Sequence, residues 1–195
     1  FGTLYNKFFG ETERNLREAL LAAEAMAPCV LWIDEIEKAI ASGDYDSGTS
    51  RRILGNLLTW MAERKAAVFI VATANAIEHL PPELIRKGRL DEIFFVDLPD
   101  APTRAEILAI HLRSRDLKPV DFDLLELANL SEGFSGAEIE QAIVAGLYLA
   151  REQQVSLDTG HLRSEIEQTR PLSQVMAEKV ERLRAWAHGR TVAAD

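Results

Sequence analysis

Apolar and polar residues follow two different periods along the first half of the chain. Residues 11–27 carry apolar side chains at spacings of three or four, which predicts an amphipathic helix that ends before Pro28. The next residues, 29–33, contain no polar side chain before an Asp-Glu pair, and this predicts a strand buried on both faces, as in parallel sheets. Two more strands are predicted, at residues 68–74 and 93–97.

Helical patterns and a loop separate these strands. A loop rich in Gly, Ser and Asp is predicted at residues 42–50. Helices are predicted at residues 35–41, 51–65 and 83–87. Strands that alternate with helices predict an α/β fold with a parallel sheet.

The second half of the chain has a different pattern, in which no strand is predicted from residue 103 onward. Residues 98–102, Leu-Pro-Asp-Ala-Pro, form the expected joint between the two halves. Helices are predicted at 103–114, 121–130, 135–153 and 173–187, with a further short helix at 158–169. The sequence thus predicts an α/β part followed by an all-α part.

Composition and charge narrow the classes of function. The 195 residues include 22 Lys and Arg against 31 Asp and Glu, a formal net charge of -9. This acidic balance argues against general, sequence-independent binding of nucleic acid. No apolar run approaches the roughly 20 residues of a membrane span. The single cysteine, Cys29, rules out an intrachain disulfide and a cysteine-based zinc cage, and we expect it to be a small buried hydrophobe. With no signal-peptide pattern at Phe1, we expect a cytoplasmic protein.

Polar side chains follow two of the predicted strands at the point where each strand ends. Asp34 and Glu35 come directly after strand 29–33, and Asn75 follows strand 68–74. The carboxyl ends of parallel strands meet at one edge of a sheet, where α/β folds bind their ligands. An apolar strand followed by Asp-Glu is typical of sites in which the Asp holds hydrated Mg2+ and the Glu orients an attacking water. The alternative is that all three are solvated turn residues.

Basic and aromatic residues supply further candidates. Arg86 and Arg89 flank a glycine that lets the backbone turn, and guanidinium groups are suited to clamping phosphate oxygens. The alternative is a solvated basic turn that pairs with Asp91 or Glu92. His111 lies in a helical pattern, where a surface or core position competes with contact to a ligand.

Two adjacent aromatics, Phe8 and Phe9, precede Gly10 and the first predicted helix. Neighbouring side chains of an extended segment point in opposite directions, so one ring can face solvent. Packing of both rings in the core is the alternative. The sequence contains no Ser-His-Asp order, no metal-ligand spacing and no paired-carboxylate arrangement suited to hydrolysing glycosides.

Taken together, three motifs resemble the AAA family of ring-forming ATPases over residues 1 to 153. The string VLWIDEIEKA is similar to the family's second nucleotide motif, Walker B, and VATANAIEHLPPELIRKGRLDEIFFVDLP to its second region of homology. GFSGAEIE is similar to the start of its sensor-2 helix. Further segments, such as DSGTSRR and PLSQVMAEKVERLRAWAHGR, are similar to sequences of a subgroup first noted as a chloroplast and cyanobacterial reading frame.

This resemblance implies a site for ATP and Mg2+. Asp34 would organise the magnesium ion, Glu35 would polarise the hydrolytic water, and Asn75 would read the γ-phosphate as sensor 1. Arg86 and Arg89 would reach the nucleotide of a neighbouring subunit. Hydrolysis would then depend on assembly into a homo-oligomer, expected to be a hexameric ring.

The resemblance also implies positions that contact the base, a protein substrate and neighbouring subunits. Ile107 and His111 would pack near adenine and ribose, and the tight helix entry beside the base would be formed by Gly136 and Ala137. The pore loop, which grips a threaded polypeptide in remodelling members, falls at Phe8, Phe9 and Gly10, and a pair often found at the subunit boundary falls at Arg51 and Arg52.

One element of the family is absent from the sequence, because the 195 residues contain no Gly-x-x-x-x-Gly-Lys-Thr/Ser phosphate loop. We expect this loop upstream of Phe1 in a longer protein, together with the strand that leads into it. That strand would lie between the strand ending at Asn75 and strand 93–97. Residues 1–100 would then be the C-terminal part of the nucleotide-binding core, and residues 101–195 a helical lid with a C-terminal extension.

Three functions compete on these grounds. The favoured one is ATP hydrolysis coupled to remodelling of a protein partner, because the acidic pair, the sensor Asn and both arginines are retained together. A non-catalytic interaction module with the AAA shape is the first alternative. A nucleic-acid remodeller of the same family is the second, although no basic element supports it. Without the phosphate loop, we expect residues 1–195 alone to have weak or no ATPase activity.

Overall fold

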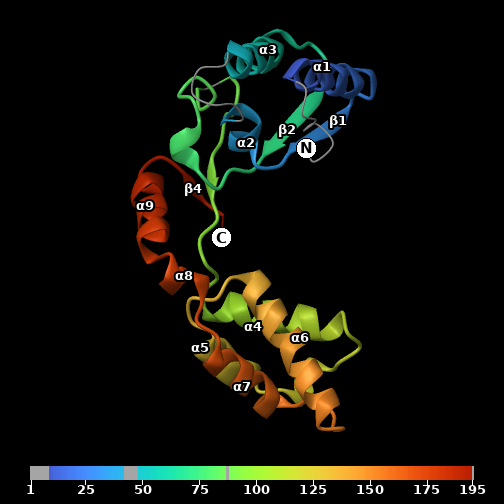
Figure 1. Ribbon diagram of the computed structural model, residues 1–195, viewed down its shortest axis with the longest axis vertical. Coiled ribbons are helices and arrows are strands. Elements are labelled where there is room, and N and C mark those ends of the chain that lie inside the picture. Colours follow the sequence, from blue (N-terminus) through green and yellow to red (C-terminus); the bar gives the residue numbers. More distant parts are fainter. Residues whose placement is uncertain (1–8, 42–47, 87, 195) are drawn as a thin grey trace. The chain divides into compact units, whose positions relative to one another are not determined.

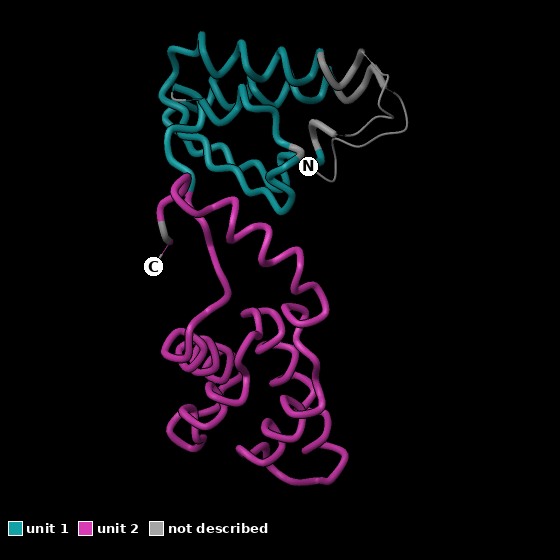
Figure 2. The backbone as a smooth tube through the Cα atoms, turned by 90° about the vertical axis from the view of Figure 1, so that its left-hand side faces the viewer, with its two compact units in different colours: residues 1–93 teal, residues 94–195 magenta. Residues whose placement is uncertain are grey.

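A computed structural model describes residues 9–41, 48–86 and 88–194. The chain divides into two compact units, residues 1–93 and 94–195, which are coloured separately in Figure 2. Each unit has its own hydrophobic core and is described separately here. Within the described ranges, no helix has both the length and the apolar character that a membrane crossing requires.

The first unit is a short parallel sheet with helices (Figure 1). Its elements are α1 (Phe9–Ala25), β1 (Cys29–Ile33), α2 (Ile36–Ala41), α3 (Gly48–Glu63), β2 (Val68–Ala72) and the 3-10 helix η1 (Ile77–His79). Strands β1 and β2 pair in parallel from Cys29 opposite Val68 to Ile33 opposite Ala72. The expected alternation of helices and parallel strands is therefore confirmed.

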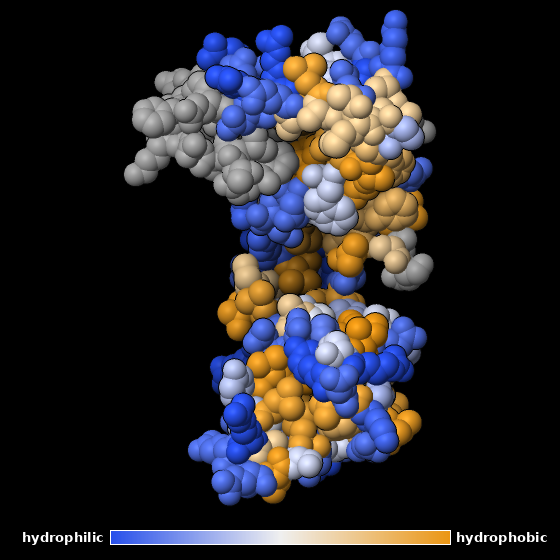
Figure 3. Space-filling view, turned by 90° about the vertical axis from the view of Figure 1, so that its right-hand side faces the viewer, coloured by the Kyte–Doolittle hydropathy of each residue, from blue (hydrophilic) through white to orange (hydrophobic). Residues whose placement is uncertain are grey.

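The two faces of this sheet differ. On one face, helices α1 and α3 pack over the strands, and the buried core includes Leu16, Leu20, Ile33, Leu57 and Met61. On the other face, Val30, Trp32 and Phe69 are 64%, 61% and 68% exposed, and Figure 3 shows hydrophobic residues at the surface of both units. The prediction that strand 29–33 is buried on both faces is thus wrong for the described residues, because α1 and α3 cover one face of the sheet only.

Other local predictions in this unit need correction. Residues 83–87 were expected to be helical, but the described part of this segment forms turns, and the short helix lies earlier, at η1. Residues 48–50 of the expected loop belong to α3, whereas residues 42–47 lie outside the described residues. Cys29 is only half-buried, and its thiol donates a hydrogen bond to the Ala23 carbonyl at 3.3 Å.

The second unit is mainly helical, as predicted. Its elements are β3 (Phe94–Phe95), α4 (Ala101–Arg113), η2 (Pro119–Asp121), α5 (Leu124–Leu130), α6 (Gly136–Glu152), α7 (Thr159–Gln168), α8 (Leu172–Val175), α9 (Ala177–Ala187) and β4 (Val192–Ala193). Helices α4 to α7 enclose a core that includes Leu108, Leu112, Leu127, Phe134, Ile143 and Leu162. Side-chain caps start these helices, as at Asp100, Asp123, Ser135 and Asp158.

The C-terminal part of this unit departs from the prediction. The expectation of no strand after residue 103 is wrong, because β4 pairs in parallel with β3, with Phe94 opposite Val192. The expected strand 93–97 shortens to two residues in this second sheet. The expected helix 173–187 is interrupted at Met176, whose backbone leaves the helical region (φ -115, ψ 31), so α8 and α9 are separate helices.

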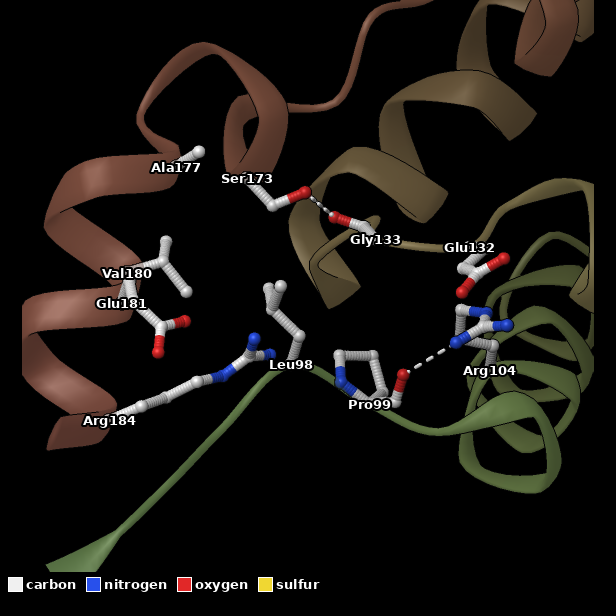
Figure 4. A pocket seen from close by; sticks show the side chains of 10 residues that line it. All are labelled: Leu98, Pro99, Arg104, Glu132, Gly133, Ser173, Ala177, Val180, Glu181 and Arg184. Carbon is white, nitrogen blue, oxygen red and sulfur yellow. Dashed lines mark hydrogen bonds between the residues drawn. The ribbon is translucent and has the colours of Figure 1, made fainter. Parts of the chain in front are cut away.

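Hydrogen bonds attach this C-terminal segment, residues 170–194, to the rest of the second unit. Ser173 Oγ donates to the Gly133 carbonyl at 2.6 Å (Figure 4), and Arg184 Nε donates to Asp97 Oδ2 at 2.8 Å. Arg104, although 94% buried, is satisfied by two carbonyls and donates to Pro99 at 2.7 Å and to Ala128 at 2.8 Å. The C-terminal segment therefore packs back onto the residues that lead into α4.

Candidate active site

The parallel pairing of β1 and β2 brings the ends of the two strands together. Thr73, the residue after β2, donates its hydroxyl hydrogen to Asp34 Oδ1 at 2.6 Å. The same hydroxyl oxygen accepts a hydrogen bond from the Glu35 backbone N–H at 2.9 Å. The Thr73 carbonyl accepts from Ile36 N at 2.9 Å, so one residue fixes the turn from β1 into α2. In this turn Glu35 has a left-handed backbone, with φ of 50.

The side chain of Glu35 is the centre of a second set of contacts. Its Oε1 accepts a hydrogen bond from the Asn75 side-chain amide at 3.3 Å. Lys38, one turn along α2, places its ammonium 2.6 Å from the Glu35 carboxylate. This hydrogen bond, with attraction from Glu35 and Glu37, raises the pKa of Lys38 above its ordinary value. The structure thus brings Asp34, Glu35 and Asn75 into one group, as the strand ends predicted.

Sequence reasoning missed three residues of this group, which are Thr73, Lys38 and Glu37. Thr73 directly precedes the Ala-Asn pair, and its register beside Asp34 was a usable signal, because parallel strand ends align. Glu37 is buried, with 4% of its surface exposed, and its Oε1 accepts from the Asn75 backbone N–H at 2.9 Å. No sequence signal separated this third acid from a solvated residue in the first turn of a helix.

We call this set of residues, Asp34, Glu35, Glu37, Lys38, Thr73 and Asn75, the acidic group. Its carboxylates are the kind of ligand that Mg2+ binds. Asp34 is exposed, and one carboxylate oxygen is oriented by Thr73. Magnesium takes hard oxygen ligands and is usually bound through one or two carboxylates, water and substrate phosphates. Within the described residues, no cluster of three or more His, Cys, Asp or Glu side chains is arranged to hold a metal alone. Asp34 therefore fits a magnesium ion that is shared with a phosphate ligand.

The two candidate arginines lie on a turn after β2. Gly88 has φ of 89, a backbone conformation that favours glycine, and its N–H donates to the Asp91 carboxylate. Arg89 donates from Nη1 to the Glu83 carbonyl at 2.6 Å, within its own turn. Arg86 is exposed. The structure places both residues at this turn, and in the part of the chain that it describes neither arginine contacts the acidic group.

In the second unit, the candidate base-binding positions lie where α4 and α6 pack together. A Cβ on Gly136, the first residue of α6, would lie 3.7 Å from Ile107 Cδ1, so Ile107 packs against the helix entry. Ser135 caps this entry in a capping box with Glu138. Ala137 is exposed.

His111, also on α4, lies beside a charged pair. Its Nδ1 is 3.6 Å from Glu140 Oε1, and the same oxygen accepts from Arg115 Nη2 at 2.8 Å. The hydrogen bond from Arg115 lowers the pKa of Glu140 below its ordinary value. The structure thus groups Ile107, His111 and the α6 entry in the second unit, apart in the chain from the acidic group.

The remaining candidates lie at the edge of the described residues. Phe8 lies outside them, while Phe9 and Gly10 begin α1, so from Phe9 onward this segment is helical and not extended. Arg51 and Arg52 are in α3, and Arg52 Nε lies 3.8 Å from Glu13 Oε2 on α1.

Comparisons with known proteins agree with these motifs. The profile of the ATPase family associated with various cellular activities (AAA) matches residues 1–98. An uncharacterized AAA domain-containing protein ycf46 from Pyropia yezoensis is 46% identical over 95% of this chain, which spans 38% of that relative's length. The ycf46 protein of Trieres chinensis is 44% identical over 95% of the chain and 38% of its own length.

A further relative matches a shorter part of the chain. The proteasome-activating nucleotidase of Aeropyrum pernix is 41% identical over 75% of this chain and 37% of its own length. The profile match covers half of the chain and includes the whole acidic group and both arginines of the turn. The chain therefore belongs to the AAA family of ATPases.

Proposed function

We propose that residues 1–195 belong to an ATP-hydrolysing AAA module that works as a homo-oligomeric ring and remodels a protein partner. The observation that carries the proposal is the acidic group, in which Thr73 joins Asp34 to the Glu35 backbone and Asn75 reaches the Glu35 side chain. A carboxylate of this kind, held at the end of a parallel strand, can orient water toward a phosphate.

Each residue then has a role that its position allows. Asp34 would hold Mg2+, which supplies charge neutralisation at the phosphates of ATP. Glu35 would orient the attacking water and accept its proton, while Asn75 would contact the γ-phosphate. In the second unit, Ile107 would pack against adenine and His111 would contact ribose.

The arginines would make hydrolysis depend on assembly of the subunits. Arg86 is exposed and can reach a neighbouring subunit, where a guanidinium stabilises the charge of phosphoryl transfer. Arg89 would do so after releasing the Glu83 carbonyl. Arg51 and Arg52, on α3, would lie at the same boundary, and Phe8, Phe9 and Gly10 would form a pore loop. The proteasome-activating nucleotidase similarity supports a protein as the substrate class.

The experiment that tests this proposal is Glu35→Gln in the full-length gene product. Glutamine keeps the shape of the side chain but cannot accept a proton, so we expect kcat for ATP to fall by about 10²- to 10⁴-fold while nucleotide binding is retained. The measurement is steady-state phosphate release beside binding of a fluorescent nucleotide. Unchanged turnover in an active assembly would refute the role of Glu35. Residues 1–195 alone, which lack a Gly-Lys-Thr/Ser loop, should show weak or no turnover.

A further inference from the structure

Glu37 is a buried acid to which the proposed mechanism assigns no role. It lies in the first turn of α2, and 4% of its surface is exposed. Burying a carboxylate is costly unless hydrogen bonds compensate it. Among the described residues, its Oε2 has no hydrogen-bond partner, while its Oε1 accepts from the Asn75 backbone N–H at 2.9 Å. A buried acid with this one recorded bond calls for an explanation at this site.

The bond to Asn75 joins two elements that carry the acidic group. Asn75 lies beyond the end of β2, and its own side chain is exposed. Its backbone is held by Glu37 from α2, while its side-chain amide reaches the Glu35 carboxylate at 3.3 Å. Glu35 and Glu37 therefore hold the same residue at two points, one at the backbone and one at the side chain.

We propose that Glu37 is a positioning residue for Asn75: it anchors the backbone of Asn75 so that the amide side chain is directed toward Glu35 and the phosphate. This inference rests on the proposed function, and it assigns Glu37 a role through Asn75 only, without direct contact to substrate or metal. The physical reason is that phosphoryl transfer depends on placement, and a displacement of about 1 Å can lower the rate by roughly 10²-fold. A merely structural acid would stabilise the fold without acting through Asn75.

The first test compares three substitutions in the full-length gene product. Glu37→Gln keeps an oxygen that accepts from the Asn75 N–H, so we expect kcat within about threefold of the parent, because the anchor survives. Glu37→Ala removes the anchor, and Glu37→Asp shortens it by one methylene, so both should lower kcat by about tenfold or more. KM for ATP should change by less than about twofold. Exposed Glu63 at the end of α3 gives the matched control, Glu63→Ala, which should leave kcat unchanged.

A double-mutant cycle with Asn75→Ala separates positioning from general stability. If Glu37 acts through the Asn75 side chain, Glu37→Asp should lower kcat by less than about twofold once that side chain is gone. A full tenfold loss in the Asn75→Ala background would overturn the inference, as would a parent-like kcat for both Glu37→Asp and Glu37→Ala. If Glu37→Ala fails to fold, the Glu37→Asp and Glu37→Gln pair decides, with thermal unfolding measured for each.

Glu35→Gln, run in the same assay, distinguishes failure of the two proposals. If Glu35→Gln abolishes turnover and Glu37→Asp does not change it, only the positioning role is wrong. If Glu35→Gln leaves turnover intact, the role of Glu35 is wrong, and the positioning role of Glu37, which acts toward Glu35, is overturned with it. If the full-length parent itself shows no ATP turnover, the proposed function is wrong.

Discussion

At the scale of single residues, Thr73 links Asp34 to the backbone of Glu35. Its one hydroxyl donates to Asp34 and accepts from the Glu35 N–H, so it uses both of its capacities inside the site. The left-handed backbone of Glu35 depends on this support, because a non-glycine residue with φ of 50 is held there by its surroundings. The geometry of both acids therefore rests on a residue that carries no charge.

Replacing Thr73 by Val should expose this dependence. Valine keeps the branched shape but removes both hydrogen bonds, so we expect kcat for ATP in the full-length gene product to fall by about 10- to 100-fold, since the acids are no longer aligned. Thr73→Ser, which keeps the hydroxyl, should retain most of the activity. Thr59→Val, at an exposed position of α3, is the control. Equal activities of the Val and Ser variants would show that the hydroxyl is dispensable.

At the scale of elements, the close packing of α6 on α7 depends on Gly146. A Cβ at this position would lie 2.8 Å from Leu162 Cδ2 and 3.2 Å from Leu157 Cδ1, too close without movement of either side chain. For Gly55, in α3, the described residues place nothing within 4 Å of such a Cβ apart from the helix's own neighbouring backbone. Both glycines are therefore helical, one in α6 and one in α3, but only Gly146 has close side-chain neighbours.

We expect Gly146→Ala to lower the free energy of unfolding by about 1–3 kcal/mol through overpacking. Gly55→Ala should raise it by about 0.5–1 kcal/mol, because alanine is the better helix former and meets no obstacle. Urea unfolding followed by circular dichroism gives both values. A stabilising Gly146→Ala would mean that Leu162 and Leu157 move aside at little cost.

Helix α9 is joined to the residues before α4 by the ion pair between Arg184 and Asp97. Partial burial opposes ionisation of Asp97, but hydrogen bonds from Arg184 and from the Leu98 N–H outweigh it, and the pKa of Asp97 is lowered. A group with a lowered folded pKa contributes stability above its unfolded pKa and loses it as the pH falls through the folded value. Asp97→Asn should therefore lower Tm at pH 7.

The same substitution should have little effect well below the ordinary Asp pKa of about 3.9, where the parent carboxyl is itself protonated. Thermal unfolding of the parent and Asp97→Asn at pH 7 and at acid pH measures the difference. Asp116→Asn, at an exposed position in the same unit, is the comparison variant. A Tm difference that stays constant with pH would show that the ion pair with Arg184 does not contribute.

The elements that the sequence predicted well are those specified by local pattern. Helices α1, α4, α6 and α7 lie within about two residues of their predicted bounds, because apolar spacing and capping residues act within one element. The pairing of β3 with β4 was missed, since it joins two-residue strands nearly a hundred positions apart. The exposed face with Val30 and Trp32 was also missed, because an apolar run does not reveal which helices cover each face.

The acidic group was likewise predicted only in part, because some of its residues follow from strand ends and others depend on packing. Asp34, Glu35 and Asn75 were found because parallel strand ends meet at one edge, a rule that needs no side-chain detail. Glu37 was missed because its burial depends on how α2 packs, and an acid in a first helical turn is ordinarily solvated. Sequence reasoning thus identified residues at strand ends but not the residues that orient them.

At the scale of the whole molecule, the proposal places each active site between two subunits. Glu35 and Arg86 of one chain would then act in different sites, because the arginine serves the neighbour. Two variants that are each inactive for different reasons can therefore complement one another in a mixed ring. Such complementation is impossible if both residues act within one chain.

We expect Glu35→Gln and Arg86→Ala of the full-length gene product each to be nearly inactive, since loss of an arginine of this kind costs about 10³-fold or more. After random mixing in equal amounts, about a quarter of the sites should pair an intact Glu35 with an intact Arg86 from the neighbour, so phosphate release should recover toward that fraction. Mixing Glu35→Gln with the Glu35→Gln/Arg86→Ala double variant leaves no competent site and is the control. No recovery in rings shown to exchange subunits would place Arg86 outside the neighbouring site.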